Sequence, residues 1–85
     1  METKTLTAWK IRHYPDKGGF FVGESNLGPI VGTADFISSD VTMIAEGEWQ
    51  NSAAWGRQFR IRSFRYASMA DSMKALFASG FLKGI

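Results

Sequence analysis

The sequence predicts an all-β fold with one C-terminal helix, built as a small five-stranded barrel that is OB-fold-like, with an SH3-like barrel as the alternative. Up to residue 66, short segments of alternating apolar and polar residues are separated by turns rich in glycine, proline, asparagine and serine. After residue 68 the apolar spacing becomes that of a helix. The 85 residues include no cysteine, so one domain has to be stabilised by its own apolar core.

The first two strands are expected at residues 6–14 and 20–25, joined as a hairpin. Between them, residues 15–19 read Pro-Asp-Lys-Gly-Gly, in which proline presets φ and the glycine pair permits positive φ. The alternation in the first strand places Trp9 and Ile11 in the core and Lys10 and Arg12 at the surface.

A third strand is expected from residue 30 to residue 34 or 37, and a fourth from residue 41 to residue 50, with a turn at residues 38–40. The interval between these strands is too short for the helix that OB-folds usually carry there. Gly47 lies inside the fourth strand, and such a glycine is expected to mark a bulge or a bend.

The fifth strand is expected at residues 57–66, where apolar and basic residues alternate. This alternation places Phe59 and Ile61 in the core, with Ser63 on the same side. Arg60 and Arg62 are expected at the surface, on the same side as Phe64.

A short helix is expected to follow the barrel, which takes up residues 1–67. Ser68 is its expected N-cap with Asp71 three residues later, and Gly80 suits the C′ position. Four residues form one apolar stripe that is expected to pack on the sheet: Met69, Met73, Leu76 and Phe77.

The charges of the chain are distributed unevenly. Residues 1–50 carry four basic and seven acidic residues, whereas residues 51–85 carry six basic residues and one acidic residue. A basic strip of this kind is a candidate for binding phosphates, although it is equally expected of an ordinary solvated strand face. The candidate nucleic-acid-binding residues are Lys10, Arg12, Trp55, Arg57, Arg60 and Arg62.

The first and last strands of a small barrel can lie close together. One patch is therefore expected to combine Lys10, Arg12, Arg60 and Arg62. Trp55, in the loop before the fifth strand, is the candidate for stacking on a base, or else a lid on the barrel. Tyr14, Phe20, Trp49 and Phe64 are further aromatic candidates, of which Trp49 is expected to be core. His13 is expected to be a buried or barrel-rim residue with one hydrogen bond.

The acidic residues do not suggest a metal site or catalysis. Glu46 and Glu48 are expected on one strand face, where they can pair with Arg60 and Arg62 and neutralise part of the basic strip. The four acidic residues Asp35, Asp40, Glu46 and Glu48 do not form a metal-ligand pattern. The chain has no phosphate-binding loop or nucleophile motif, so no catalytic residue and no cofactor are assigned to it.

Three motifs resemble the N-terminal domain of RecD-like ATP-dependent DNA helicases, the family grouped with the exodeoxyribonuclease V alpha subunit. The central one is Gly47-Glu48-Trp49, a short loop, and then Trp55-Gly56-Arg57-Gln58-Phe59. Gly19-Phe20-Phe21-Val22 is similar to the first hairpin of the family, and residues 78–85 are similar to its small-Gly-apolar-apolar-Lys-Gly-Ile segment. The sequence departs from the family at Ser52, where histidine is frequent, and at Trp55, where tyrosine is common.

The resemblance covers about residue 6 to residue 85 and implies an accessory domain of a larger DNA helicase. Residues 68–85 would then be a helix and the start of a helix-hairpin-helix linker, and the chain a fragment of that helicase. ATP and Mg²⁺ are expected only in the parent enzyme. Single-stranded DNA and the rest of the helicase are the expected partners, in the cytoplasm and without a membrane. The alternative is a structural docking module without DNA contact, whose exposed apolar surface supports a weak homodimer.

Overall fold

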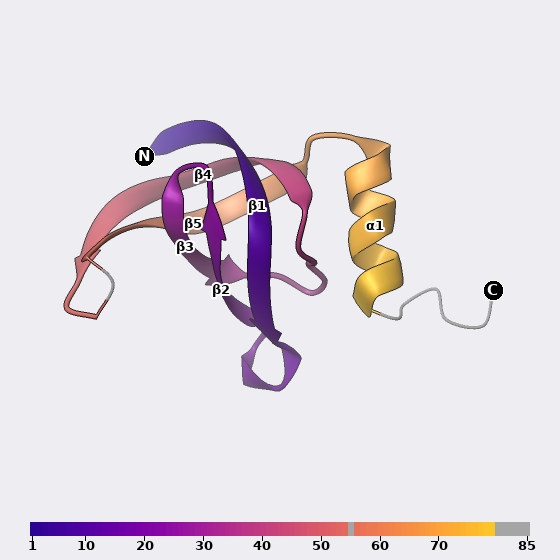
Figure 1. The fold of residues 1–85 in the computed structure, drawn as a ribbon, viewed down its shortest axis with the longest axis horizontal. Helices are drawn as coiled ribbons and strands as arrows, with labels where there is room; N and C mark the ends of the chain where they lie inside the picture. The colour runs from indigo at the N-terminus through magenta and orange to yellow at the C-terminus, as the bar shows by residue number, and fades with distance from the viewer. Residues whose placement is uncertain (55, 80–85) are drawn as a thin grey trace.

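The computed structural model describes residues 1–54 and 56–79, and it shows a closed five-stranded barrel followed by one helix (Figure 1). The strands are β1 (Glu2–Tyr14), β2 (Phe20–Ser25), β3 (Gly28–Thr33), β4 (Val41–Ser52) and β5 (Gly56–Tyr66). Their order around the barrel is β1-β2-β3-β5-β4, and β4 pairs with β1 to close it. The expected mostly-β barrel with a C-terminal helix is confirmed.

The pairing pattern is that of a small five-stranded barrel, as both the OB-like and the SH3-like expectation require. All neighbouring strands are antiparallel except β3 and β5, which run parallel and pair at Ile30 with Phe59 and at Val31 with Arg60. β1 pairs with β4 through residues 2–8 and with β2 through residues 8–14. This double pairing explains why β1 begins earlier than the alternation predicts. No helix lies between β3 and β4, as expected from the short interval.

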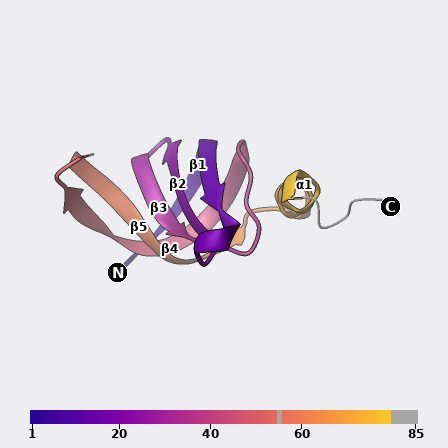
Figure 2. The same cartoon turned by 90° about the horizontal axis from the view of Figure 1, so that it is seen from below.

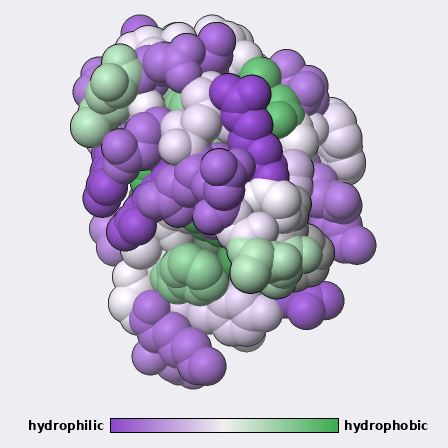
Figure 3. Space-filling model, turned by 90° about the vertical axis from the view of Figure 1, so that its left-hand side faces the viewer, coloured by the Kyte–Doolittle hydropathy of each residue, from purple (hydrophilic) through white to green (hydrophobic). Residues whose placement is uncertain are grey.

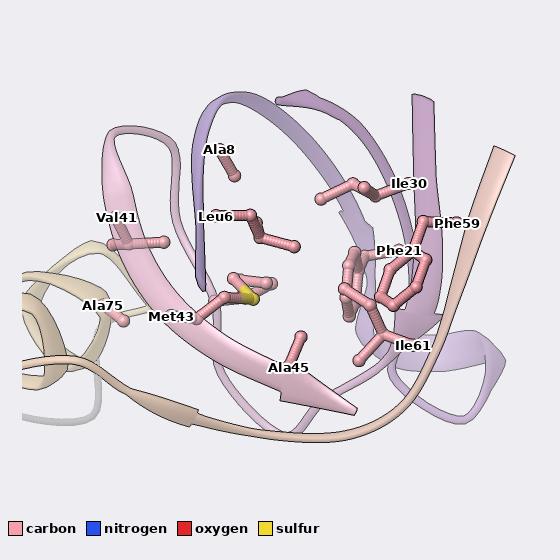
Figure 4. Packing of buried hydrophobic residues seen from close by; sticks show 11 residues of the cluster. Leu6, Ala8, Phe21, Ile30, Val41, Met43, Ala45, Phe59, Ile61 and Ala75 are labelled. Carbon is pink, nitrogen blue, oxygen red and sulfur yellow. The ribbon is translucent and has the colours of Figure 1, made fainter. Parts of the chain in front are cut away.

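The core fills the interior of the barrel with side chains from every strand (Figure 4). Phe21 and Phe59 are the largest fully buried side chains, and Phe59 and Ile61 are inside, as expected. The other buried apolar residues of the cluster are Leu6, Ala8, Ile30, Ile37, Val41, Met43, Ala45 and Ala75.

The expected position of Trp9 is wrong because β1 contains a bulge. Ala8 pairs with Ser25 and Lys10 with Glu24, so Trp9 is an extra residue without a partner on β2. The bulge reverses the alternation, so that Leu6 and Ala8 before it and Ile11 after it all face inward. Trp9 is 52% exposed, whereas Ile11 packs against the core as expected.

A second bulge, in β5, lies at the position where Gly47 was expected to mark one. Glu46 pairs with Ser63 and Gly47 pairs with Ile61, which leaves Arg62 as the extra residue. Ser63 is therefore exposed, and Phe64 packs against the core with its ring edge-to-face on Phe21, at a centroid distance of 6.2 Å. The expected sides of Ser63 and Phe64 were thus wrong, because the alternation was extended through the bulge.

The turns form where the sequence places them. Residues 15–17 make one turn of 3₁₀-helix, and Gly18 and Gly19 follow with φ of 71° and 78°. A Cβ on Gly19 would lie 2.3 Å from the carbonyl oxygen of Ala34, so this glycine is also needed for space. His13 is a half-buried residue whose Nε2 lies 2.9 Å from the same oxygen, in agreement with the expected single hydrogen bond.

The connector at residues 34–40 is fastened to the barrel by polar and aromatic contacts. The Tyr66 hydroxyl donates a hydrogen bond to the Phe36 carbonyl at 2.6 Å, and the two rings stack with centroids 5.8 Å apart. The Ile11 backbone N–H donates to Ser39 Oγ at 3.0 Å. The Ile11 contact covers part of β1 beyond its pairing with β4, and the Tyr66 contacts join the connector to β5.

The helix α1 (Met69–Ser79) lies beside the barrel, as Figure 2 shows from below. Its N-terminus is capped as expected: the Asp71 N–H donates to Ser68 Oγ at 3.2 Å, and the Ser68 hydroxyl donates to Asp71 Oδ2 at 2.7 Å. Asp71 Oδ1 accepts a hydrogen bond from Thr42 N–H, and Lys74 Nζ donates to the Asp40 carbonyl. The expected C′ residue lies outside the described residues.

The expectation that the apolar stripe packs on the sheet is wrong for three of its members. Met69, Met73 and Phe77 are 80%, 41% and 59% exposed. The helix instead buries Ala75 and half-buries Leu76. The polar contacts of Asp71 and Lys74 with β4 and its preceding turn orient the helix, and they turn the methionine and phenylalanine side chains outward.

We expect Gly47→Ala to destabilise the barrel strongly. A Cβ at this position would lie 2.1 Å from the Arg60 carbonyl oxygen, which is backbone and can move only with β5. The expected loss is about 3 kcal/mol of unfolding free energy or more, measured by urea unfolding. Gly18→Ala is the control: that glycine has φ of 71° and open space around it, so only the roughly 1–2 kcal/mol of left-handed strain is expected. Equal losses in the two variants would contradict the steric role of Gly47.

We expect the stability to fall above pH 10. Burial raises the pKa of Tyr66 from 10.0 to about 12 because the ionised phenolate is less well solvated in the folded chain. This stability is fully present below pH 10 and is lost as the pH rises through 12, because the unfolded chain releases the proton first. Urea midpoints at both ends of this range measure the change, and Tyr66→Phe should show a smaller one. An unchanged pH dependence in that variant would assign it to other groups.

Candidate nucleic-acid interface

The outer surface of four neighbouring strands brings basic residues of β1 and β5 onto one face. Arg12 pairs with Val22, Val22 with Val31, and Val31 with Arg60, so these residues form one row across β1, β2, β3 and β5. Figure 2 shows these four strands side by side. Three strand spacings separate Arg12 from Arg60, which is roughly 14 Å along the curved surface of the barrel.

Two adjoining hollows lie on this surface and share Val31 and Gln58. Lys10 and Arg12 line the first, together with Glu24. Arg60 and Arg62 line the second, together with other residues that include Phe20, Thr33 and Gln50. We call this surface the outer basic face and define it by Lys10, Arg12, Phe20, Val22, Val31, Gln58, Arg60 and Arg62.

Aromatic rings lie at one end of the outer basic face. Phe20 is 39% exposed and stacks on Tyr14 with centroids 6.3 Å apart and an angle of 25° between the planes. Lys17 Nζ lies 6.0 Å from the centroid of the Tyr14 ring. Because Phe21 next to it is fully buried, the alternation in β2 directs Phe20 outward.

One cation of the outer basic face is already paired. Glu48 accepts a hydrogen bond from Arg62 Nε at 2.9 Å and forms an ion pair with Arg62 Nη2. Hydrogen bonding and the positive charge of Arg62 lower the pKa of Glu48, with a smaller contribution from Arg60. The expected pairing across β4 and β5 is therefore confirmed for Glu48 with Arg62.

Arg57 does not belong to this face. Its guanidinium lies 4.3 Å from the centroid of the Trp49 ring, which itself contacts Phe59 edge-to-face with centroids 5.1 Å apart. Arg57 alternates with Gln58 on β5 and thus lies on the opposite side of the β4–β5 ribbon. Trp49 is half-buried against the core, as expected. Trp55 lies outside the described residues.

The structure thus groups four of the six candidate residues, although for a different reason than the sequence indicated. β1 and β5 are not neighbours in the barrel; β2 and β3 join their basic residues. Sequence reasoning missed the apolar floor of Val22 and Val31, and it missed Glu24, which lies opposite Lys10. Which residues meet on this face depends on the pairing register across four strands. The alternation within single strands does not show that register.

Within residues 1–54 and 56–79, no three histidine, cysteine or acidic residues gather in a way that could hold a metal ion. In the same part of the chain, every buried side-chain nitrogen and oxygen has a hydrogen-bond partner. Among the described helices, none is long and apolar enough to cross a bilayer.

Figure 3 shows the surface of the molecule at the end where β4 and β5 lie farthest from α1. Hydrophilic side chains cover most of this view, and apolar residues appear only in small separate areas.

No protein-family model, curated protein or solved structure matches this chain.

We expect Arg57→Ala to reduce stability by about 0.5–1 kcal/mol, because it removes an exposed cation–π contact with Trp49. Urea unfolding followed by tryptophan fluorescence measures this loss. Arg65→Ala on the same strand is the matched control, since it removes the same charge without contacting Trp49. Equal effects of the two changes would show that the ring contact contributes nothing.

Proposed function

We propose that the outer basic face binds single-stranded DNA. The observation that carries this proposal is the row from Arg12 through Val22 and Val31 to Arg60, with the exposed Phe20 ring beside it. Proteins that bind single strands combine cations for the phosphates with exposed aromatic rings for the bases. In OB-type barrels, the face of the second and third strands is a common place for such ligands.

The charges on the outer basic face predict weak binding of a single strand. It carries four cations, but Glu48 holds Arg62, whereas Glu24 lies opposite Lys10 without an ion pair within the described residues. Lys10, Arg12 and Arg60 are therefore left to supply the expected phosphate contacts. Few contacts of this kind predict weak, salt-sensitive binding that does not depend strongly on base sequence.

The test is a titration of a fluorescently labelled single strand of about 15 nucleotides, followed by anisotropy at several salt concentrations. Wild-type protein should bind saturably. Arg12→Ala and Arg60→Ala should each weaken binding and reduce the salt slope by roughly 0.7. Phe20→Ala should weaken binding at least about fivefold through the loss of base stacking.

Arg65→Ala is the matched control for Arg60→Ala because both remove one arginine from β5, and Arg65 lines neither hollow. It should change the affinity much less. Absence of binding by the wild-type protein at low salt would overturn the proposal, and so would equal losses in the two arginine variants.

A docking module is the second candidate, and the exposed side of α1 favours it. Met69, Met73 and Phe77 lie at helical spacing and are exposed. A protein that lacks DNA binding but self-associates, and that becomes monomeric when Met73 and Phe77 are both changed to serine, would support this alternative. Size-exclusion chromatography with light scattering provides the measurement.

The wider role that we propose is that of an accessory domain in a RecD-like DNA helicase. Its support is the order of the three motifs in the sequence. Gly47 and Trp49 of the central motif lie in β4, and Phe59 ends that motif in β5. Phe20 of the hairpin motif contributes the exposed ring of the proposed DNA-binding face. The helicase motor would supply ATP hydrolysis, and this domain would guide the strand.

A further inference from the structure

Glu48 occupies the guanidinium of Arg62 in the way that a DNA phosphate would. The carboxylate accepts hydrogen bonds from Nε and from Nη2, so it engages two donors of the same guanidinium. The side chains of Arg62 and Glu48 are 45% and 43% exposed, so solvent and ligands can reach the pair. Arginine offers the same planar set of donors to carboxylates and to phosphates.

The bulge in β5 sets up this pair. Arg62 is the extra residue, and Arg60 pairs directly with Glu48 across the β4–β5 ladder. One carboxylate therefore lies beside two arginines of the same hollow, but it forms its hydrogen bonds with Arg62 only. Arg60 lies beside Glu48 and has no ion pair within the described residues.

We propose that Glu48 is an internal competitor that limits the affinity of the outer basic face by occupying Arg62, an inference that rests on the proposed DNA binding. The carboxylate is part of the same fold and lies on the neighbouring strand, so its effective concentration at Arg62 is high. A strand that binds through Arg60 reaches Arg62 only by displacing Glu48. Wild-type protein thus uses one phosphate contact fewer than the arginines of the hollow would allow.

The test compares Glu48→Gln with Glu24→Gln in the anisotropy titration. Both changes remove one negative charge from the vicinity of the outer basic face, but Glu24 has no ion pair within the described residues. Glu24→Gln reports the general effect of the charge. Glu48→Gln should tighten binding about three- to fivefold more than this control and steepen the salt slope by roughly 0.7, the value for one more contact.

A double-mutant cycle isolates the role of Arg62. In the wild-type background, Arg62→Ala should change the affinity little, because Glu48 already occupies this arginine. In the Glu48→Gln background, the same change should remove the whole additional gain and restore the original salt slope. Far-ultraviolet circular dichroism on all variants confirms that the barrel is retained.

The outcomes separate the two proposals. If wild-type protein binds and Glu48→Gln behaves like Glu24→Gln, the internal competitor is overturned while DNA binding stands. The same holds if Arg62→Ala costs as much affinity in the wild-type background as in the Glu48→Gln background. If neither wild-type protein nor Glu48→Gln binds a single strand at low salt, the proposed function falls, and the inference falls with it.

Discussion

The close approach of β4 to β5 at Gly47 is the constraint on which the rest of the structure depends. The Arg60 carbonyl oxygen lies 2.1 Å from where a Cβ of residue 47 would be, so only glycine allows the two strands to come this near. The register shifts at this point, and β5 accommodates the extra residue Arg62. The bulge lets Ile61 before it and Phe64 after it both face the interior, which a regular strand would not allow.

The same irregularities decide which chemistry the surface presents. In β1 the bulge at Trp9 keeps Ala8 and Ile11 inside and leaves Lys10 on the outside. In β5 the bulge places Arg62 next to Glu48. The charged surface is therefore a consequence of how a short chain closes a barrel: strands that bend sharply need extra residues, and extra residues direct side chains outward.

The sequence was sufficient to predict every strand, the hairpin turn, the helix and the inward positions of Ile11, Phe59 and Ile61, because alternation, glycine and proline act locally. Most of the other core residues were not predicted, and the alternation in the first strand placed Leu6 and Ala8 on the surface side. The side of Trp9 was missed because no glycine marks the bulge in β1. Gly47 marked the position of the second bulge, but it did not show that the extra residue lies on β5, so the sides of Ser63 and Phe64 were missed as well. The grouping of Lys10 and Arg12 with Arg60 and Arg62 was expected, but its basis was not. That basis is the parallel contact of β3 with β5, which depends on the strand order of the closed barrel.

That parallel contact has a consequence for the dynamics of the barrel. β3 and β5 are joined in register at only two positions, whereas β4 and β5 pair along nearly their whole length. We therefore expect the amide protons at the junction of β3 and β5 to exchange with solvent earlier than those of the β4–β5 ladder.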